Sequence, residues 1–258
     1  MLSEYFRFAY RSAGEYQVWS HLGWRDLRVR FSRTRLGPWW STLAQSVLVI
    51  GIATATSLIA QENFREHLLR VSVSLLVWTF IANVILESID VFSLERGLLL
   101  NTRINELSFS YRIVWRQVLL SLYSFPIPVV CAVVSSTFSP RLFLLPIFVA
   151  LTGAALVAPS FLVGYITLRR RDFVQIIPPL VQFGFFFSPV MWQVPTSGRL
   201  AALSTFNPLA WTMEGVRDLV LGGHIFGRNL ALWVIFVFAS IMFLPSLAPI
   251  AKQVRVRI

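Results

Sequence analysis

The sequence predicts an all-α integral membrane protein, and three observations support this class. The chain of 258 residues is 56% hydrophobic, with a mean hydropathy of +0.67. Only 14% of its residues are charged, whereas about a quarter are charged in a typical water-soluble domain. The apolar residues gather into stretches of about 20, the length that crosses a bilayer as a helix. We therefore expect several membrane spans with short connections.

Residues 1–37 precede the first apolar stretch and are expected to form a cytoplasmic or interfacial segment. Apolar side chains recur there at helical spacing, with Arg25 and Arg35 on other faces. This pattern is typical of an amphipathic helix on the inner membrane surface, with guanidinium groups near lipid phosphates. A plain cationic stop before the first span is the alternative. The expected interface residues are Trp24, Leu27, Arg28 and Phe31.

Residues 38–251 are expected to form a six-helix transmembrane domain, and residues 252–258 a cytoplasmic tail. The predicted spans cover residues 38–60, 71–91, 113–138, 142–168, 173–192 and 230–250. Of the 23 lysine and arginine residues, seventeen fall on the side of the N-terminus and six on the other side. Cytoplasmic connections carry the excess of positive charge, so we expect both termini in the cytoplasm.

The connection between the fifth and sixth spans, residues 193–228, is too polar to cross the membrane. Asn207-Pro208 is a typical helix start, because the asparagine caps the helix and the proline fits its first turn. Gly222-Gly223 is a typical stop. We expect short external helices here that either lie on the outer surface or re-enter the membrane. Leu209, Met213, Val216 and Val220 share the predicted apolar face, with Glu214, Arg217 and Asp218 opposite.

The residue patterns of several enzyme chemistries are missing. A phosphate loop needs a lysine after glycine, but the only lysine is Lys252, which follows Ala251. The chain is therefore not expected to hydrolyse ATP, and we predict no catalytic, cofactor-binding or metal-binding residue. The single cysteine, Cys131, forms no intrachain disulfide. The histidines are isolated and are expected to face solvent in separate connections: His21, His67 and His224.

The net charge of +11 does not indicate nucleic-acid binding, because the arginines lie at the ends of apolar segments, where they meet lipid headgroups and soluble partners. One acidic pair falls within a predicted span. Glu87 and Asp90 are three residues apart near the inner end of the second span, beside Arg96. We favour a structural or gating role for this pair, with a proton relay as the alternative.

Four segments in order carry a family resemblance. They are RVRFSRTRLGPWWSTL (28–43), ERGLLLNTRI (95–104), RRRDFVQIIPPLVQFGFFFSPVMW (169–192) and FNPLAWTMEGVRDLVLG (206–222). Together they resemble the ABC-2-type polysaccharide-export permeases, the transmembrane subunits of O-antigen, capsule and teichoic acid ABC transporters. The resemblance extends over nearly the whole chain. One departure is Leu107-Ser108-Phe109, which stands where relatives often have a proline before the third span.

The resemblance implies a homodimer of permeases in the bacterial inner membrane, joined to two copies of a separate ATP-binding subunit that holds ATP and Mg. The implied cargo is a lipid-linked polysaccharide, and the LGPWW and SPVMW strings favour an O-antigen-like polymer. Capsule or teichoic acid export, and drug or small-lipid export by the same fold, are alternatives. A membrane-embedded glycosyltransferase is the last alternative. It would need a carboxylate or metal site near the membrane, and Glu214 with Asp218 is the only acidic pair expected to face outward.

The resemblance also assigns roles to three groups of residues. Coupling to the ATPase is expected from Arg96, Leu98, Leu99, Leu100, Asn101, Arg103, Arg169, Arg170, Arg171 and Asp172. The polymer path is expected to be lined by Trp39, Trp40, Trp78, Phe183, Phe187 and Trp192. The external helix is expected to act as a gate at the exit, through Asn207, Pro208, Trp211, Met213 and Arg217. For Leu98, Leu99 and Leu100, the alternative to coupling is burial against the membrane at the end of the second span.

Overall fold

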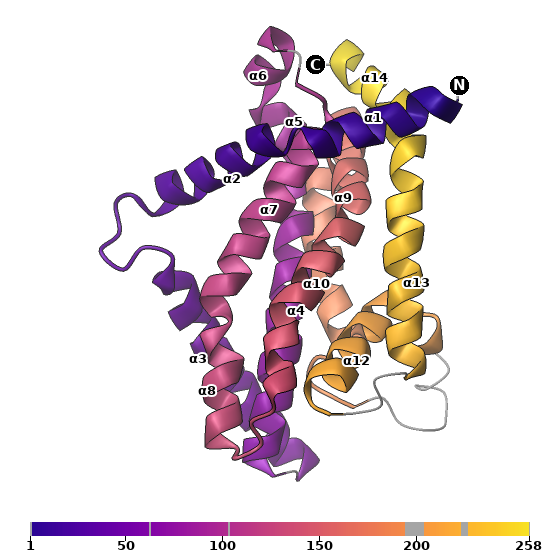
Figure 1. Ribbon diagram of the computed structural model, residues 1–258. Helices are drawn as coiled ribbons and strands as arrows, with labels where there is room; N and C mark the ends of the chain where they lie inside the picture. Colours follow the sequence, from indigo (N-terminus) through magenta and orange to yellow (C-terminus); the bar gives the residue numbers. More distant parts are fainter. Residues whose placement is uncertain (1, 62, 103, 194–203, 223–226, 258) are drawn as a thin grey trace.

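A computed structural model describes residues 2–61, 63–102, 104–193, 204–222 and 227–257 of the chain. These residues form a bundle of helices, with no strand among them (Figure 1). Both chain termini lie at the same end of the bundle, which we call the terminal end. The other end is called the opposite end. The predicted fold class, an all-helical membrane protein, is confirmed.

Most elements from α1 to α10 follow one another with short connections. Helices α1 (Leu2–Gly14) and α2 (Tyr16–Phe31) lie across the terminal end, crosswise to the long helices (Figure 1). The remaining elements are α3 (Trp39–Ala60), α4 (Phe64–Ser88), α5 (Val91–Leu94), α6 (Arg96–Asn101), α7 (Leu107–Ser124), α8 (Pro126–Val134), η1 (Pro140–Leu144), α9 (Leu145–Arg169), α10 (Phe173–Phe187), α12 (Pro208–Val220), α13 (Arg228–Phe243), η2 (Leu244–Leu247) and α14 (Ala248–Arg257).

Five helical segments of the described chain are long and apolar enough to cross a membrane. They are Trp39–Ile59, Phe64–Ser88, Leu107–Val134, Pro140–Arg169 and Arg228–Val254. The second segment begins seven residues before its predicted start at 71, because the Asn63 side chain caps α4 by accepting a hydrogen bond from the Arg65 amide at 3.1 Å. At the C-terminus, α14 continues through the predicted tail at 252–258 as far as Arg257.

The predicted fifth span, residues 173–192, contains a shorter helix than expected. α10 has 15 residues, which makes it about 22 Å long at 1.5 Å per residue. The hydrocarbon core of a bilayer is about 30 Å thick, so α10 alone does not cross it. The backbone becomes extended at Ser188, and residues 188–193 are not helical. The described chain therefore has five long spans and one short apolar helix where six spans were predicted.

α4 is the central helix of the bundle. It contacts α3, α7, α8, α9, α10 and α12, and most of its side chains are buried. Two glycines of α9 let neighbouring helices approach closely. A Cβ atom at Gly153 would lie 2.9 Å from Val114, and one at Gly164 would lie 2.6 Å from Val91. Small residues at such contacts are typical of membrane bundles, where helix association depends on close packing.

The third span begins at Leu107, six residues before its predicted start at 113, and is divided at Pro126. Proline has no amide hydrogen but fits the first turn of a helix, so α7 ends and α8 begins there. The first turns of α7 are buried because α1, α2 and α5 pack against this helix. The chain is therefore helical where the sequence predicted a solvated connection.

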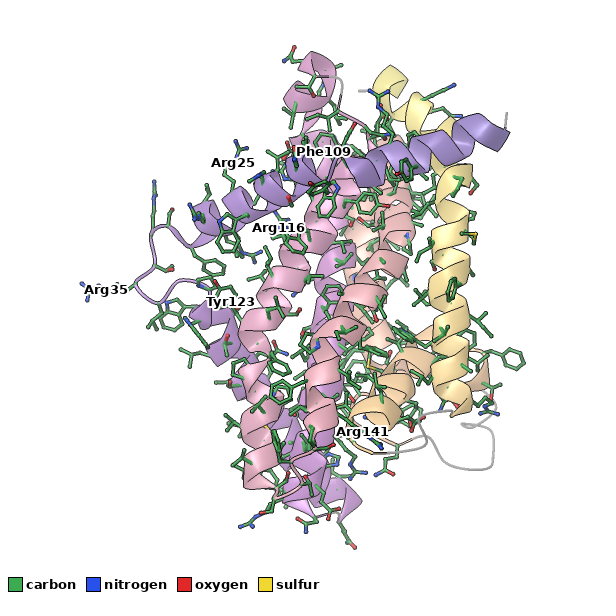
Figure 2. All side chains as sticks on the ribbon, in the orientation of Figure 1. Arg25, Arg35, Phe109, Arg116, Tyr123 and Arg141 are labelled. Atoms are coloured by element: carbon green, nitrogen blue, oxygen red, sulfur yellow. The ribbon has the colours of Figure 1, made fainter. Side chains whose placement is uncertain are left out.

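The helix predicted at the membrane interface is α2. Trp24 and Arg28 are exposed on it, and the Arg28 guanidinium lies 5.3 Å from the Trp24 ring centre. Arg25 extends away from the bundle (Figure 2). Leu27 differs from the prediction, because it is buried inside the protein and is not available to lipid. Arg35 also differs, since it lies in the connection after α2 ends at Phe31.

Candidate functional site

Both predicted coupling segments lie at the terminal end, where α6 extends beyond the bundle (Figure 1). The Thr167 hydroxyl near the end of α9 donates a hydrogen bond to the Ile89 carbonyl at 2.6 Å. The Arg171 guanidinium lies 3.9 Å from the Asp90 carboxylate. The exposed polar residues of the two segments are Arg96, Asn101, Arg169, Arg170, Arg171 and Asp172. Both segments are therefore polar and exposed at the terminal end.

The leucines predicted to act together in coupling have different environments. Leu99 is 1% exposed and belongs to the hydrophobic core, whereas Leu100 is 57% exposed and Leu98 is partly buried. Leu99 is therefore unavailable to a partner, and the proposed set is wrong at this position. Leu94 of α5, which the sequence analysis missed, is 80% exposed beside them. Arg103 lies outside the described residues.

A network of charged side chains attaches α2 to α7. Arg112 of α7 donates two hydrogen bonds to the Asp26 carboxylate of α2, Nε to Oδ2 at 2.6 Å and Nη2 to Oδ1 at 2.8 Å. This bidentate arrangement is the strongest geometry for an arginine and a carboxylate. The third nitrogen of Arg112 lies 3.0 Å from the Glu95 carboxylate, which precedes α6. One guanidinium thus joins α2, α7 and the coupling segment.

The network continues one turn further along α7, at Arg116 (Figure 2). The Arg116 guanidinium bonds Asp26 at 3.1 Å and Glu87 of α4 at 2.5 Å. Arg30 of α2 bonds the other oxygen of Glu87 at 2.7 Å. The structural role favoured for Glu87 is supported by these contacts, but its partners are Arg30 and Arg116 and not Arg96. The spacing of Arg112 and Arg116, one helical turn apart, was the sequence signal that could have revealed this cluster.

A second contact attaches the N-terminal helices to the same region. One carboxylate oxygen of Glu15, between α1 and α2, accepts hydrogen bonds from the Ser108 hydroxyl at 2.7 Å and the Asn105 amide at 3.3 Å. Residue 105 lies between α6 and α7. Glu15 therefore joins the junction of α1 and α2 to the start of α7 and to the connection before it.

At the opposite end, α12 has the predicted bounds and cap. The Asn207 side chain accepts a hydrogen bond from the Leu209 amide at 3.0 Å, and Pro208 occupies the first turn. Met213 is fully buried, and Trp211 donates to the Thr205 carbonyl at 3.0 Å. The helix packs against α4, α9, α13 and η1, so it lies within the bundle and not on its surface (Figure 1).

Arg217 of α12 is the main departure from the predicted arrangement. It was expected to face outward, but it is only 8% exposed. Its guanidinium bonds the Ser74 hydroxyl of α4 at 2.8 Å and the Glu214 carboxylate at 2.7 Å. It also donates to the carbonyls of Val190 at 3.0 Å and Trp192 at 3.1 Å. Arg217 therefore holds α12, α4 and the non-helical segment after α10 together.

Glu214 is the acidic partner of Arg217. Burial raises the pKa of its carboxyl group, and the neighbouring Arg217 guanidinium partly opposes this effect. A catalytic pair of Glu214 and Asp218, as the glycosyltransferase alternative requires, would need Glu214 to face a substrate. Its carboxylate is instead bound to a buried guanidinium. The geometry therefore favours a structural role.

An aromatic cavity of about 580 Å³ lies beside α12. Its lining combines two predicted path residues, Phe187 and Trp192, with two predicted gate residues, Asn207 and Pro208. The other lining residues are Phe186, Ser204 and Phe206. Phe206 is the N-terminal neighbour of the Asn207 cap, and the sequence analysis did not assign it to the path. Apolar ring faces and a few polar groups thus meet at the opposite end.

The remaining predicted path residues are not all close to this cavity. Phe183 contacts Phe187, with ring centres 4.7 Å apart, and Trp78 contacts Phe185 on α10 at 5.6 Å. Trp39 and Trp40 lie instead on α3, which packs against α4 and α7. The Trp39 ring contacts Tyr123 of α7 at 5.9 Å. Within one chain, the tryptophans of α3 are therefore separate from the aromatic residues of α10.

His67 was expected to face solvent in a connection. It instead lies in the first turn of α4, is buried, and its Nε2 is 2.6 Å from the Thr56 hydroxyl of α3. In the described part of the chain, no three His, Cys, Asp or Glu side chains gather as ligands for a metal ion.

The sequence profile of the ABC-2 type transporter family matches residues 17–221, from the start of α2 to just beyond α12. The match includes all the coupling, path and gate residues predicted above. No curated protein matches the sequence.

Proposed function

We propose that this chain, which belongs to the ABC-2 type transporter family and is thereby a permease subunit of an ABC transporter, exports a lipid-linked polysaccharide. Two copies form a homodimer in the bacterial inner membrane, with both termini in the cytoplasm. Two copies of a separate ATP-binding subunit, which hold ATP and Mg, supply the energy. The observation that carries the proposal is the family match over 17–221, together with an exposed polar surface on α6 and the α9–α10 turn.

The cargo is supported by the RTRLGPWW, SPVMW and FNPLAW strings and by the aromatic cavity beside α12. Aromatic faces contact sugar rings without holding their hydroxyl groups in strong hydrogen bonds. An O-antigen-like polymer is the cargo we favour. In the proposed mechanism, closure of the ATPase dimer pushes on α6 and the α9–α10 turn, the two permeases move as rigid bodies, and a path opens between them.

The orientation is tested by labelling single cysteines from outside the cell in a Cys131→Ser background. Cysteine in place of Gln61, at the opposite end, is expected to react with a membrane-impermeant maleimide. Cysteines in place of Arg170 and Gln253, both exposed at the terminal end, should react only after the cells are opened. Reaction of the Arg170 variant in intact cells would reverse the proposed orientation and place the coupling surface outside.

Coupling to the ATPase is tested by introducing charge at the exposed leucines. Leu94→Asp and Leu100→Asp should disrupt apolar contact with the partner, because burial of one leucine contributes about 1.5–3 kcal/mol. A loss of 1.4 kcal/mol weakens binding about tenfold. The chain is co-expressed with the ATP-binding subunit of its transporter, and copurified ATPase and surface polysaccharide are measured. We expect at least a tenfold loss of copurified ATPase, with the permease at its normal level.

Two further variants serve as controls for this experiment. Leu36→Asp changes an exposed leucine of the α2–α3 connection, outside both coupling segments, and should retain the ATPase. Leu99→Asp places a charge in the core and should lower the amount of folded permease. If Leu94→Asp and Leu100→Asp both retain the ATPase and normal export, these helices are not the coupling element. If surface polysaccharide persists after deletion of the permease, this polysaccharide is not the exported substrate.

A further inference from the structure

A polar groove between the first three spans is separate from the aromatic cavity and the coupling surface. It has a volume of about 290 Å³ and lies between α3, α4 and α7, with Arg30 and Phe31 of α2 at its edge. Each span contributes polar residues one turn apart, which places them on one face of that helix. These residues are Ser41, Gln45, Thr79, Asn83, Gln117 and Ser121. Three membrane helices therefore direct polar faces to one place.

Two glutamines in the groove have unused hydrogen-bonding capacity. Gln45 is 9% exposed and Gln117 is 2% exposed, and the Nε2 atom of each has no hydrogen-bond partner among the described residues. Polar side chains within a membrane span are unfavourable unless they are satisfied, and they usually mark functional sites. Both amides line the groove, so each can donate hydrogen bonds to oxygen atoms of a ligand there.

One arginine, Arg30 of α2, lines the edge of the groove, and the chain around it is basic. Residues 25–35 contain five exposed arginines and one aspartate. Arg30 also bonds Glu87, and the other four arginines add positive charge to α2 and the α2–α3 connection without lining the groove. Arginines next to a membrane span attract anionic lipid headgroups. Gln45 is seven residues into the bilayer from Pro38, about 10 Å along the helix. The Gln45 amide therefore lies deeper in the bilayer than Arg30, which is at the edge of the groove.

We infer that the groove binds the polar head of a lipid from the terminal-side leaflet. An anionic phosphate lies near Arg30 at the edge of the groove, and ester, hydroxyl or glycosidic oxygens accept hydrogen bonds from Gln45 and Gln117. Leu48 and Leu76, farther from the terminal end, line the deeper part of the groove and contact the acyl or prenyl chain. Both a phospholipid and a lipid-linked sugar carry this combination of phosphate, neutral oxygens and hydrocarbon.

The test measures lipid binding to the purified full-length chain by native mass spectrometry. The probes are phosphatidylglycerol and a polyprenyl-diphosphate-linked monosaccharide. Gln45→Leu and Gln117→Leu remove the amides while leaving side chains suited to a membrane interior. Each is expected to weaken binding of at least one probe fivefold or more. Gln175→Leu, the same change at an exposed position of α10, is the matched control and should bind both probes within twofold of the native chain.

The pattern of losses identifies the source of the lipid. Weaker binding of the linked monosaccharide alone would assign the groove to a lipid-linked sugar. Weaker binding of phosphatidylglycerol alone, or of both probes, would assign it to lipid headgroups in general. If a glutamine variant does not yield folded protein, Asn83→Ala at the exposed rim tests the same groove, with a loss of at least fourfold expected, which lies outside the twofold range of the control. Unchanged binding of both probes in every folded groove variant would overturn the inference.

Discussion

Replacing Arg217 with leucine is expected to lower the free energy of unfolding by about 3–5 kcal/mol, because removal of one member of a buried ion pair leaves its partner uncompensated. In this chain, Arg217→Leu removes more interactions than a single ion pair. Glu214 would lose its bonded counter-charge, and the carbonyls of Val190 and Trp192 would each lose a donor. Unfolding by SDS in mixed micelles, followed by tryptophan fluorescence, measures the change.

A matched control and a double variant separate this effect from a general loss of arginine. Arg228→Leu, at an exposed arginine in the first turn of α13, should change the free energy of unfolding by no more than about 0.5 kcal/mol. The double variant Arg217→Leu with Glu214→Leu should recover about 0.5–3 kcal/mol relative to the sum of the single changes. If Arg217→Leu has the stability of Arg228→Leu, the buried network does not hold α12 in place.

The helices were predictable because their signals are local. Apolar stretches of membrane-spanning length placed all five long spans, although their ends differ by several residues. The Asn207-Pro208 start of α12 was correct to the residue, since capping depends on neighbours in the sequence. The predicted span at α10 was longer than the observed helix, because the sequence stays apolar past Ser188-Pro189-Val190. The backbone is instead extended at Ser188.

The environments of charged residues were not predictable from local pattern. Arg217 follows Glu214 by three residues on what reads as a polar helix face, yet that face packs against Ser74 of α4, more than a hundred residues earlier. Leu99 likewise lies within an apolar run whose periodicity does not show which leucine is buried. Burial of this kind depends on contacts between distant segments.

Only part of the candidate site was predicted, because its remaining contacts also join distant segments of the chain. The resemblance assigned both coupling segments to the cytoplasmic side, Phe187 and Trp192 to the path, and Asn207 to the gate. In the structure both segments lie at the terminal end, and these three residues line one cavity. It did not reveal the network that joins Asp26 to Arg112, because these residues are 86 positions apart. Trp39 was assigned to the same path, but it contacts Tyr123 on α7.

The network around Asp26 gives the last prediction. Asp26→Ala should release α2 from α7, because Arg112 loses both bonds of its bidentate pair and Arg116 loses one of its two carboxylates. Truncating one partner of a largely buried charge pair costs about 2–5 kcal/mol. Since 1.4 kcal/mol is tenfold in an equilibrium constant, the equilibrium constant for opening of α2 should increase roughly 30-fold or more.

Hydrogen exchange of residues 16–31, measured by mass spectrometry, reports this opening. Arg25→Ala changes the adjacent exposed residue of α2 and should leave exchange unchanged. Arg112 also bonds Glu95, which precedes α6, so the change at Asp26 should also disturb the coupling segment. We therefore expect the transporter with this loosened α2 to hydrolyse ATP without exporting its substrate. Native exchange rates in Asp26→Ala would show that packing of α2 on α7, and not the ion-pair network, positions this helix.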